Sequence, residues 1–161
     1  MKTLRCTFIA LFFLTLFVSP ARGAAGPSIL AFQINGIGVF PAAGDTIYSG
    51  QLAWIPSLSA GAIGVRGELG AAWLKNVAND RFWQLNYEGY LVFSVTPVTD
   101  IELGGGLATW TGGNGGTHPI LGGYLVFSLP GLFHRIYAGY SRFLVSGANA
   151  NELKVGFGFS L

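Results

Sequence analysis

The chain has 161 residues, of which 51% are hydrophobic and only 10% are charged, and its formal net charge is +2. Soluble domains average about 25% charged residues, so this composition argues against an ordinary soluble domain. The absence of a basic cluster argues against a partner that is a nucleic acid, and the single cysteine, Cys6, rules out a disulfide framework.

The first 23 residues predict a cleaved signal peptide. Lys2 and Arg5 precede an apolar run over 6–18, and Ala21-Arg22-Gly23 supplies the small residues that a signal peptidase requires. This run is shorter than the ~20 residues that span a bilayer, although an uncleaved signal anchor remains the alternative. We therefore expect a signal peptide at 1–23 and a single mature domain at 24–161, which carries six basic and seven acidic residues and no cysteine.

Alternation of apolar and polar residues with a period of two dominates the mature chain. Along 83–95 the odd positions are apolar and the even positions are mainly polar, which is typical of a strand with two different faces. With turn residues as boundaries, the sequence predicts eight strands, at 28–40, 46–57, 62–74, 83–95, 99–110, 118–129, 132–145 and 152–161. The fold class is therefore all-β.

The connections between these strands alternate in kind. Four are polar or rich in Gly and Asn, at 41–45, 75–82, 111–117 and 146–151, and three are tight, at 58–61, 96–98 and 130–131. An even number of antiparallel strands, with both termini on the side of the tight turns, is the arrangement of outer-membrane barrels. We predict an eight-stranded antiparallel up-and-down transmembrane β-barrel.

The sequence also contains a repeat and two stretches rich in glycine. Gly89-Tyr-Leu-Val-Phe-Ser94 recurs as Gly123-Tyr-Leu-Val-Phe-Ser128, a spacing that suits one hairpin and its loop, and we interpret this repeat as architectural. Gly104–Gly106 and Gly112–Gly116 do not have the surroundings of a phosphate-binding loop. The first is interpreted as a strand section where side chains must be absent, and the second as a surface loop.

The composition of the polar face indicates which face meets lipid. Small residues crowd this face and the mature chain has only two lysines, whereas the outside of a soluble lipocalin-like barrel would be charged. We therefore predict that the apolar face points outward to lipid, with a lipocalin-like periplasmic binding barrel as an alternative. Two interfacial belts of aromatic residues follow from this orientation: Tyr48, Trp73, Trp83 and Tyr87 near the loops, and Trp54, Phe93 and Phe127 near the turns.

Charged residues fall on the predicted inner face of several strands. We expect a network of ion pairs that fills the barrel, or alternatively lines a narrow path for ions, from Arg66, Glu68, Glu88, Glu102, Arg135 and Lys154. In the seventh strand, Arg135, Tyr137 and Ser141 are placed inward, so that Arg142 points outward and must lie at the outer rim.

The two histidines argue for neither a metal site nor a catalytic site. His118 and His134 are expected at opposite ends of the barrel, where they cannot converge on a metal, and we expect no metal and no cofactor. Lipid A deacylases are also small barrels and carry a His-x-Ser-Asn element. Here His118 is followed by Pro-Ile and His134 by Arg-Ile, so we expect no enzyme, with a lipid A-modifying activity as a remaining alternative.

In the last residues, apolar side chains alternate strictly with Lys, Gly or Ser, and this pattern completes a resemblance to a known family. The apolar side chains are Leu153, Val155, Phe157, Phe159 and Leu161. Together with the signal peptide and the eight segments, this pattern resembles the small OmpA/OmpX-type outer-membrane barrels over nearly the whole mature length. The chain differs in ending in Leu161 where the family usually has Phe.

The resemblance implies a monomer in the outer membrane of a Gram-negative bacterium, with a structural, adhesive or permeability-related role. It also implies that the terminal strand is an assembly signal, read by the barrel-insertion machinery after transit with periplasmic chaperones. The expected surroundings are outer-membrane lipid and lipopolysaccharide. We expect a structural or surface-interaction barrel, and a narrow ion or solute channel is the main alternative.

Overall fold

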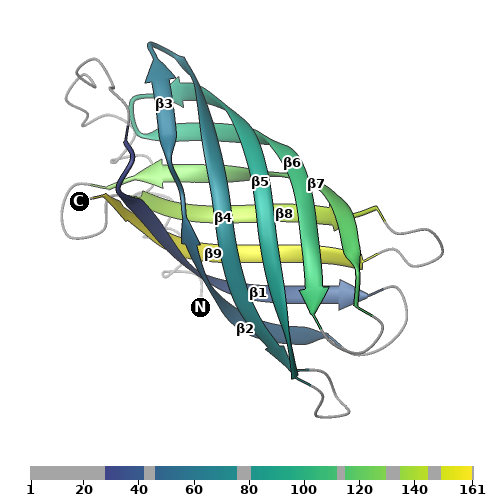
Figure 1. Ribbon diagram of the computed structural model, residues 1–161. Helices are drawn as coiled ribbons and strands as arrows, with labels where there is room; N and C mark the ends of the chain where they lie inside the picture. Colours follow the sequence, from purple (N-terminus) through teal and green to yellow (C-terminus); the bar gives the residue numbers. More distant parts are fainter. Residues whose placement is uncertain are drawn as a thin grey trace, which may run out of the picture.

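The computed structural model describes residues 28–41, 46–75, 81–111, 115–129, 135–144 and 150–160. The predicted signal peptide, His134 and Leu161 lie outside these ranges. The described residues form nine β-strands (Figure 1): β1 (Ala31–Pro41), β2 (Ile47–Trp54), β3 (Ser57–Ala60), β4 (Ile63–Lys75), β5 (Arg81–Thr96), β6 (Thr99–Thr111), β7 (Thr117–Ser128), β8 (Arg135–Phe143) and β9 (Ala150–Ser160). No helix in this part of the chain is long and apolar enough to cross a membrane.

The strands form one antiparallel sheet that closes on itself. The order is β2-β1-β9-β8-β7-β6-β5-β4-β3, and β2 also pairs with β4. Because β2 and β3 pair with successive parts of β4, they are two sections of one barrel strand, and Figure 1 shows them in line along it. The wall therefore has eight strands, and closure leaves no long edge unpaired. The predicted eight-stranded barrel is confirmed.

The prediction for the second strand is wrong in one respect. It was expected to run unbroken over 46–57 and to turn at 58–61, but it breaks at Ile55 and Pro56 and resumes as β3. Proline has no backbone N–H to give to a ladder, and the Pro56 carbonyl instead accepts a hydrogen bond of 2.8 Å from the Gly67 N–H. The turn follows β3 at Gly61, whose φ of 64° suits glycine.

We call the two ends of the barrel the loop end and the turn end. Connections at the loop end cover 42–46, 76–80, 112–116 and 144–149, and the turn end holds the connections at 61–62, 97–98 and 129–134. The first and last strands meet at the turn end, where Ala31 pairs with Ser160. The first and last strands thus lie on the side of the two tightest turns, as the sequence predicts, but the connection at 129–134 is as long as those at the loop end and is not the tight turn predicted at 130–131.

Burial follows the period-two pattern, with polar side chains inside and apolar side chains outside. Leu91 and Val155, for example, are more than half exposed on the outer face. The polar and charged residues that are buried in the described part are Gln33, Asn35, Gln51, Arg66, Glu68, Gln84, Asn86, Glu88, Asp100, Glu102, Ser141, Glu152 and Lys154. A soluble barrel has the opposite distribution, whereas a membrane barrel has this one.

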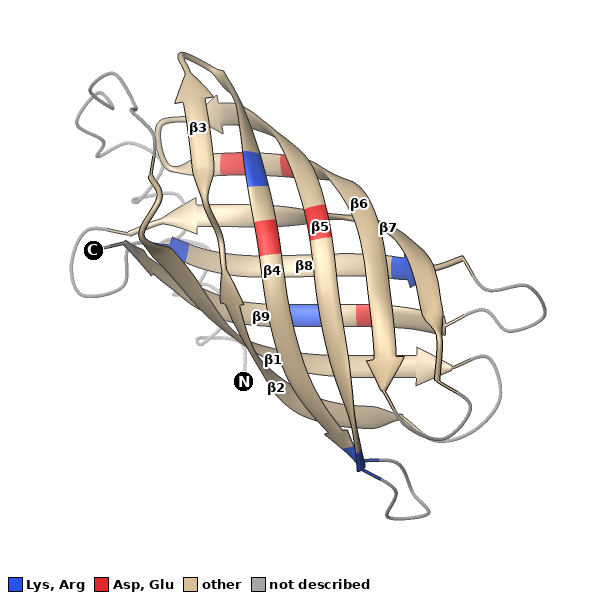
Figure 2. Cartoon of the chain, viewed as in Figure 1, with Lys and Arg blue, Asp and Glu red and all other residues tan. Residues whose placement is uncertain are grey.

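Inside the barrel, a polar layer lies between two apolar clusters. At the loop end, Ile37, Leu74, Ile120 and Phe143 belong to a buried cluster, against which Trp110 packs. Toward the turn end, a second cluster contains Ala31, Ala53, Ile55, Tyr90, Tyr124, Val126 and Tyr137. Figure 2 shows charged residues along β4, β5 and β9 between these two ends, two acidic residues on β6 toward the turn end, and a cation at each end of β8.

Candidate functional site

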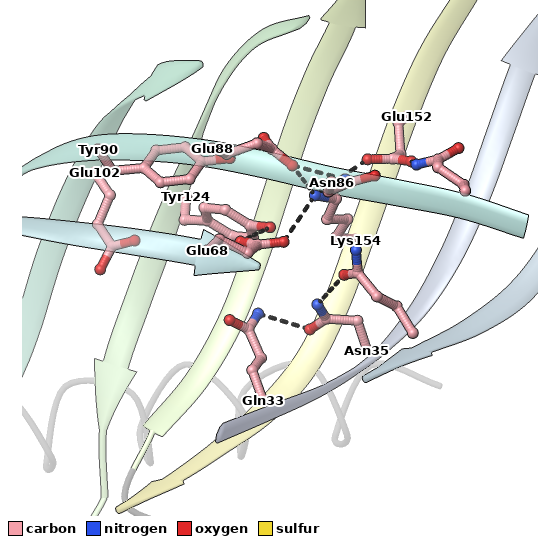
Figure 3. A network of polar contacts seen from close by, with 12 residues as sticks. Gln33, Asn35, Glu68, Asn86, Glu88, Tyr90, Glu102, Tyr124, Glu152 and Lys154 are labelled. Carbon is pink, nitrogen blue, oxygen red and sulfur yellow. Dashed lines mark hydrogen bonds and ion pairs between the residues drawn. The ribbon is translucent and has the colours of Figure 1, made fainter. Parts of the chain in front are cut away.

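The interior charges come from four strands that present the same face. Alternate residues of a strand share a face, so Arg66 and Glu68 of β4 point inward together. The register places Glu68 opposite Glu88 of β5, and Glu102 of β6 is two residues from Gly104, the partner of Tyr90. Lys154 of β9 approaches from the opposite wall, and Figure 3 shows it between carboxylates of different strands.

Arg66 lies in a cage of carboxylates and tyrosine rings. Its Nε atom is 2.6 Å from Glu102 Oε2, and its Nη1 atom is 3.1 Å from Glu68 Oε2. The guanidinium carbon is also 4.4, 4.8 and 5.5 Å from the ring centroids of Tyr90, Tyr124 and Tyr137. These distances are within the range of cation–π attraction, which is strongest where water is excluded. Arg66 is 2% exposed, so the cage takes the place of water around it, although its Nη2 atom has no hydrogen-bond partner among the described residues.

Lys154 contacts three carboxylates. Its Nζ atom lies 3.0 Å from Glu68 Oε1, 2.8 Å from Glu88 Oε1 and 3.3 Å from Glu152 Oε1. Glu68 therefore bridges the two cations, because one of its oxygens binds Arg66 and the other binds Lys154. The Tyr124 hydroxyl donates a hydrogen bond of 2.9 Å to Glu68, and the Tyr90 hydroxyl donates one to Glu88.

Amide side chains extend the network toward the loop end and across the barrel. Gln84 Nε2 donates to Glu152 at 2.6 Å, and Trp110 Nε1 donates to Gln84 at 2.9 Å. Asn86 Nδ2 donates to Glu88 at 2.7 Å. Across the barrel, Gln33 donates to Asn35 and Asn35 to Gln51, at 2.6 and 2.7 Å. The hydrogen bonds from Gln84 to Glu152 and from Asn86 to Glu88 matter because four glutamates contact only two cations in the network. The remaining carboxylate oxygens need neutral donors.

In this arrangement the buried charges compensate one another. A buried charge is costly unless it is paired and hydrogen-bonded, and each cation of the network has at least two carboxylate partners. Within the described residues, the network is bounded at both ends by buried apolar side chains. Toward the turn end this boundary includes Tyr90, Tyr124 and Tyr137 of the cage itself.

The structure brings five of the six predicted network residues into direct contact: Arg66, Glu68, Glu88, Glu102 and Lys154. Arg135 lies half-buried at the start of β8, where it lines a cavity of about 40 Å³ with Tyr137 near the turn end. Tyr137 and Ser141 are buried and Arg142 is exposed near the loop end, which is the orientation predicted for this strand.

Sequence reasoning missed Glu152 and the tyrosine cage. Glu152 is two residues before Lys154, so the alternation that placed Lys154 inward also applied to it. Tyr90 and Tyr124 hold equivalent positions in the two copies of the Gly-Tyr-Leu-Val-Phe-Ser repeat, and their rings meet edge to face with centroids 5.2 Å apart. The repeat was therefore a signal for the cage as well as for the hairpins.

The predicted outer-face residues are exposed or half-buried. Leu153, Val155 and Phe157 are 46–59% exposed, and Phe159 is half-buried. Near the loop end, Tyr48, Trp73, Trp83 and Tyr87 are 44–73% exposed. Nearer the turn end, Trp54 and Phe93 are each 37% exposed and Phe127 is half-buried. Trp54 and Tyr87, which were assigned to different belts, are both register partners of Leu69, so the division of these aromatic residues into two interfacial belts stays a prediction.

His118 is half-buried at the loop end, with its ring 4.9 Å from that of Trp110. In the described part of the chain, no group of three or more His, Cys, Asp and Glu residues could hold a metal ion. His118 thus packs against an aromatic ring of the loop-end cluster.

Known proteins resemble this chain in fold. No protein-family model matches it, and no curated protein matches its sequence. The attachment invasion locus protein Ail of Yersinia pestis has a TM-score of 0.60 and 15% identity over 83% of this chain and 99% of its own. Neisserial surface protein A has a TM-score of 0.59 and 13% identity over 85% of this chain and 100% of its own.

The N-terminal β-barrel domain of Pseudomonas aeruginosa OprF is a third similar structure. Its TM-score is 0.51, with 18% identity over 82% of this chain and 99% of that domain. Identities this low carry information about the fold alone. The chain has the fold of the small eight-stranded outer-membrane β-barrels of the OmpA/OmpX type.

Proposed function

We propose that this protein is a closed barrel of the bacterial outer membrane with a structural or surface-interaction role, and that its interior network stabilises the wall. One observation carries the proposal: charges that are almost completely buried contact each other in a layer enclosed between two apolar clusters. Such an interior offers water and ions no continuous polar path. The biological role would then belong to the outer surface and the loop end.

Three features support the membrane location. The outer face carries exposed apolar residues on every barrel strand, and its aromatic residues lie toward both ends. β4 has 13 residues and β5 has 16, which exceeds the ~9–11 tilted residues that a spanning strand needs. In this location the loop end faces outward and the chain termini face the periplasm.

A surface role also has support from the similar structures. By their names, one is an attachment invasion locus protein and another is a surface protein. In this chain the connections at the loop end have only five or six residues between strand ends. A partner would therefore meet a low rim, and the chain lacks the long loops with which an extended adhesin would reach its target.

Single-channel conductance in planar bilayers tests the closed interior. The wild-type protein should show no reproducible open level, because the loop-end cluster would have to move before ions could reach the carboxylates. A reproducible open level that disappears in a Glu88→Ala variant would overturn the proposal and support the narrow channel. Purified lipopolysaccharide should also be left chemically unchanged, and acyl release that is lost in His118→Ala would instead support the enzyme alternative.

Heat-modifiable gel migration tests the membrane barrel itself. The detergent-extracted protein should migrate differently before and after boiling, because a closed barrel resists the detergent when cold. Identical migration, together with recovery from the soluble periplasm, would contradict the location and favour a lipocalin-like barrel. The same extract should show the monomer, with the terminal strand β9 serving the insertion machinery and chaperones during biogenesis.

A further inference from the structure

Among the residues that the structure describes, the charges are segregated by sign. All five acidic residues that the structure describes are buried in the interior: Glu68, Glu88, Asp100, Glu102 and Glu152. The exposed cations of the described part are Lys75, Arg81 and Arg142, and all three lie at or near the loop end. Figure 2 shows the first two together where β4 ends and β5 begins. The described charges of the outer rim on this wall are therefore both cationic, and Asp80, which precedes Arg81 in the sequence, lies outside the described residues.

Lys75 and Arg81 stand directly above an aromatic pair. They are register partners, and two residues deeper Trp73 and Trp83 are partners as well. Because alternate residues share a face, all four side chains project from the same outer surface. The two indole rings meet edge to face, with centroids 4.7 Å apart. Nearby on β2, Tyr48 is 73% exposed, and the Ser49 hydroxyl donates a hydrogen bond to the Trp73 carbonyl.

Below the aromatic pair lies an apolar groove. Ala71 is the register partner of both Leu52 and Leu85, so a short side chain is flanked by longer ones. The groove has a volume of about 330 Å³ and is lined by Phe32, Leu52, Leu69, Ala71, Leu85 and Tyr87. Ala71 is four residues from Lys75 along β4, or roughly 13 Å at ~3.3 Å per strand residue.

We propose that this wall, which we call the β4–β5 rim site (Lys75, Arg81, Trp73, Trp83 and the groove at Ala71), binds a phosphorylated, acylated glycolipid of the outer leaflet. The order of cation, aromatic ring and apolar groove down the wall matches that of phosphate, sugar and acyl chain in such a lipid. Lys75 and Arg81 contact the phosphate, and one acyl chain lies in the groove. The inference rests on the proposed membrane location and loop-end orientation.

The opposite wall offers a matched control. In the closed sheet, β8 lies four strands from β4, and its Arg142 is also an exposed cation near the loop end. Its register partners are Leu121 and Asn151, so it has neither a cationic partner nor an aromatic pair beside it. Arg142→Gln removes one positive charge from the same rim without touching the β4–β5 rim site, and it is the matched control for each of the single variants Lys75→Gln and Arg81→Gln.

Binding of purified lipid A to the folded protein in detergent, followed by native mass spectrometry, tests the charged part of the site. Lys75→Gln/Arg81→Gln should weaken binding at least about tenfold, because both cations contact the phosphate of the lipid bound at this site. Arg142→Gln should change it less than about twofold, because Arg142 lies on the opposite wall and does not contact the lipid bound at the β4–β5 rim site. Equal binding by the double variant and the wild type, or an equal loss in Arg142→Gln, would overturn the site.

Two further probes separate the phosphate from the acyl chain. Dephosphorylated lipid A should bind the wild type as weakly as intact lipid A binds the double variant. Inorganic phosphate at equal concentration should not displace lipid A, and displacement would show that free phosphate is the ligand. Ala71→Leu fills the groove without altering charge and should also weaken lipid A binding, whereas unchanged binding would remove the groove from the proposal.

Each variant is first checked by heat-modifiable migration. A wild-type protein that shows no folded species contradicts the proposed membrane barrel itself. Folded variants that bind lipid A like the wild type contradict only the β4–β5 rim site. The two failures are therefore distinguishable.

Discussion

At the scale of single residues, Lys154 and Arg66 hold the interior together from different strands. Lys154 reaches from β9 to carboxylates on β4 and β5, and Arg66 reaches from β4 to Glu102 on β6. In each of these contacts the two strands are not neighbours in the sheet. Figure 3 shows this for Lys154 of β9 and Glu68 of β4. Such contacts fix the cross-section of the barrel in a way that backbone ladders between neighbours do not.

Lys154→Met should destabilise the barrel strongly. The substitution keeps the bulk of the side chain but leaves Glu68, Glu88 and Glu152 without their shared cation. Removing one partner of a buried ion pair costs about 3–5 kcal/mol. The free energy of unfolding can be measured by guanidinium titration in micelles, with Lys75→Met as the control because Lys75 is exposed. Equal stability of the two variants would contradict the structural role of the network.

The inward orientation of the charged residues was predictable from the sequence, but their contacts were not. Period-two alternation fixes the face of Arg66, Glu68 and Lys154 without any knowledge of their neighbours. The pairing of Lys154 with Glu68 depends on barrel closure, which brings residues 86 positions apart to 3.0 Å. Glu152 was missed because it stands where the predicted strand began, although it shares the face of Lys154.

At the scale of strands, glycines make room for the tyrosine rings. Gly139 of β8 is the register partner of Tyr124 of β7, and Tyr90 and Tyr137 also lie opposite glycines, Gly104 and Gly156. A Cβ atom on Gly139 would lie 2.4 Å from the Tyr124 ring. The small residues of the inner face are therefore complementary to the three rings around Arg66.

Gly139→Ala should lower stability, whereas Gly89→Ala should not. Overpacking of a filled interior costs about 1–3 kcal/mol. Gly89 faces outward, and an added Cβ atom there meets no atom within 4 Å. The midpoints of guanidinium unfolding for the two variants can be compared directly, because both change one strand glycine to alanine. A Gly139→Ala midpoint equal to that of Gly89→Ala would show that the ring does not need this space.

The strand pattern was predicted well except where backbone chemistry competed with side-chain alternation. The break at Ile55 and Pro56 is one such place, because the apolar and polar alternation continues through it while the ladder does not. At Gly104–Gly106, by contrast, the sequence prediction and the backbone agree. There the sequence indicated a section without side chains, and a Cβ atom on Gly104 would lie 2.0 Å from the Gly89 carbonyl oxygen.

At the scale of the whole molecule, the inner and outer surfaces have exchanged the roles that they have in a soluble barrel. The polar interior needs closure to pair its charges, and the apolar exterior needs a lipid environment to be stable. β9 serves both requirements, because it pairs with β1 to close the sheet and presents Leu153, Val155 and Phe157 outward. Closure and membrane insertion are therefore expected to occur together.

Two arginine substitutions at different depths on the outer face test whether this face contacts lipid. Val155 is at the middle of β9 and 59% exposed, and Leu144 follows β8 at the loop end and is 47% exposed. In a membrane barrel, arginine costs about 2–4 kcal/mol at the bilayer midplane and about 0–1 kcal/mol near the interface. Val155→Arg should therefore destabilise the protein in phospholipid vesicles far more than Leu144→Arg does. In a soluble barrel both changes would fall within about 0.5 kcal/mol of the wild type, because both side chains would face water. A flat profile across the two positions would thus contradict the lipid-facing surface on which the location, the orientation and the β4–β5 rim site all depend.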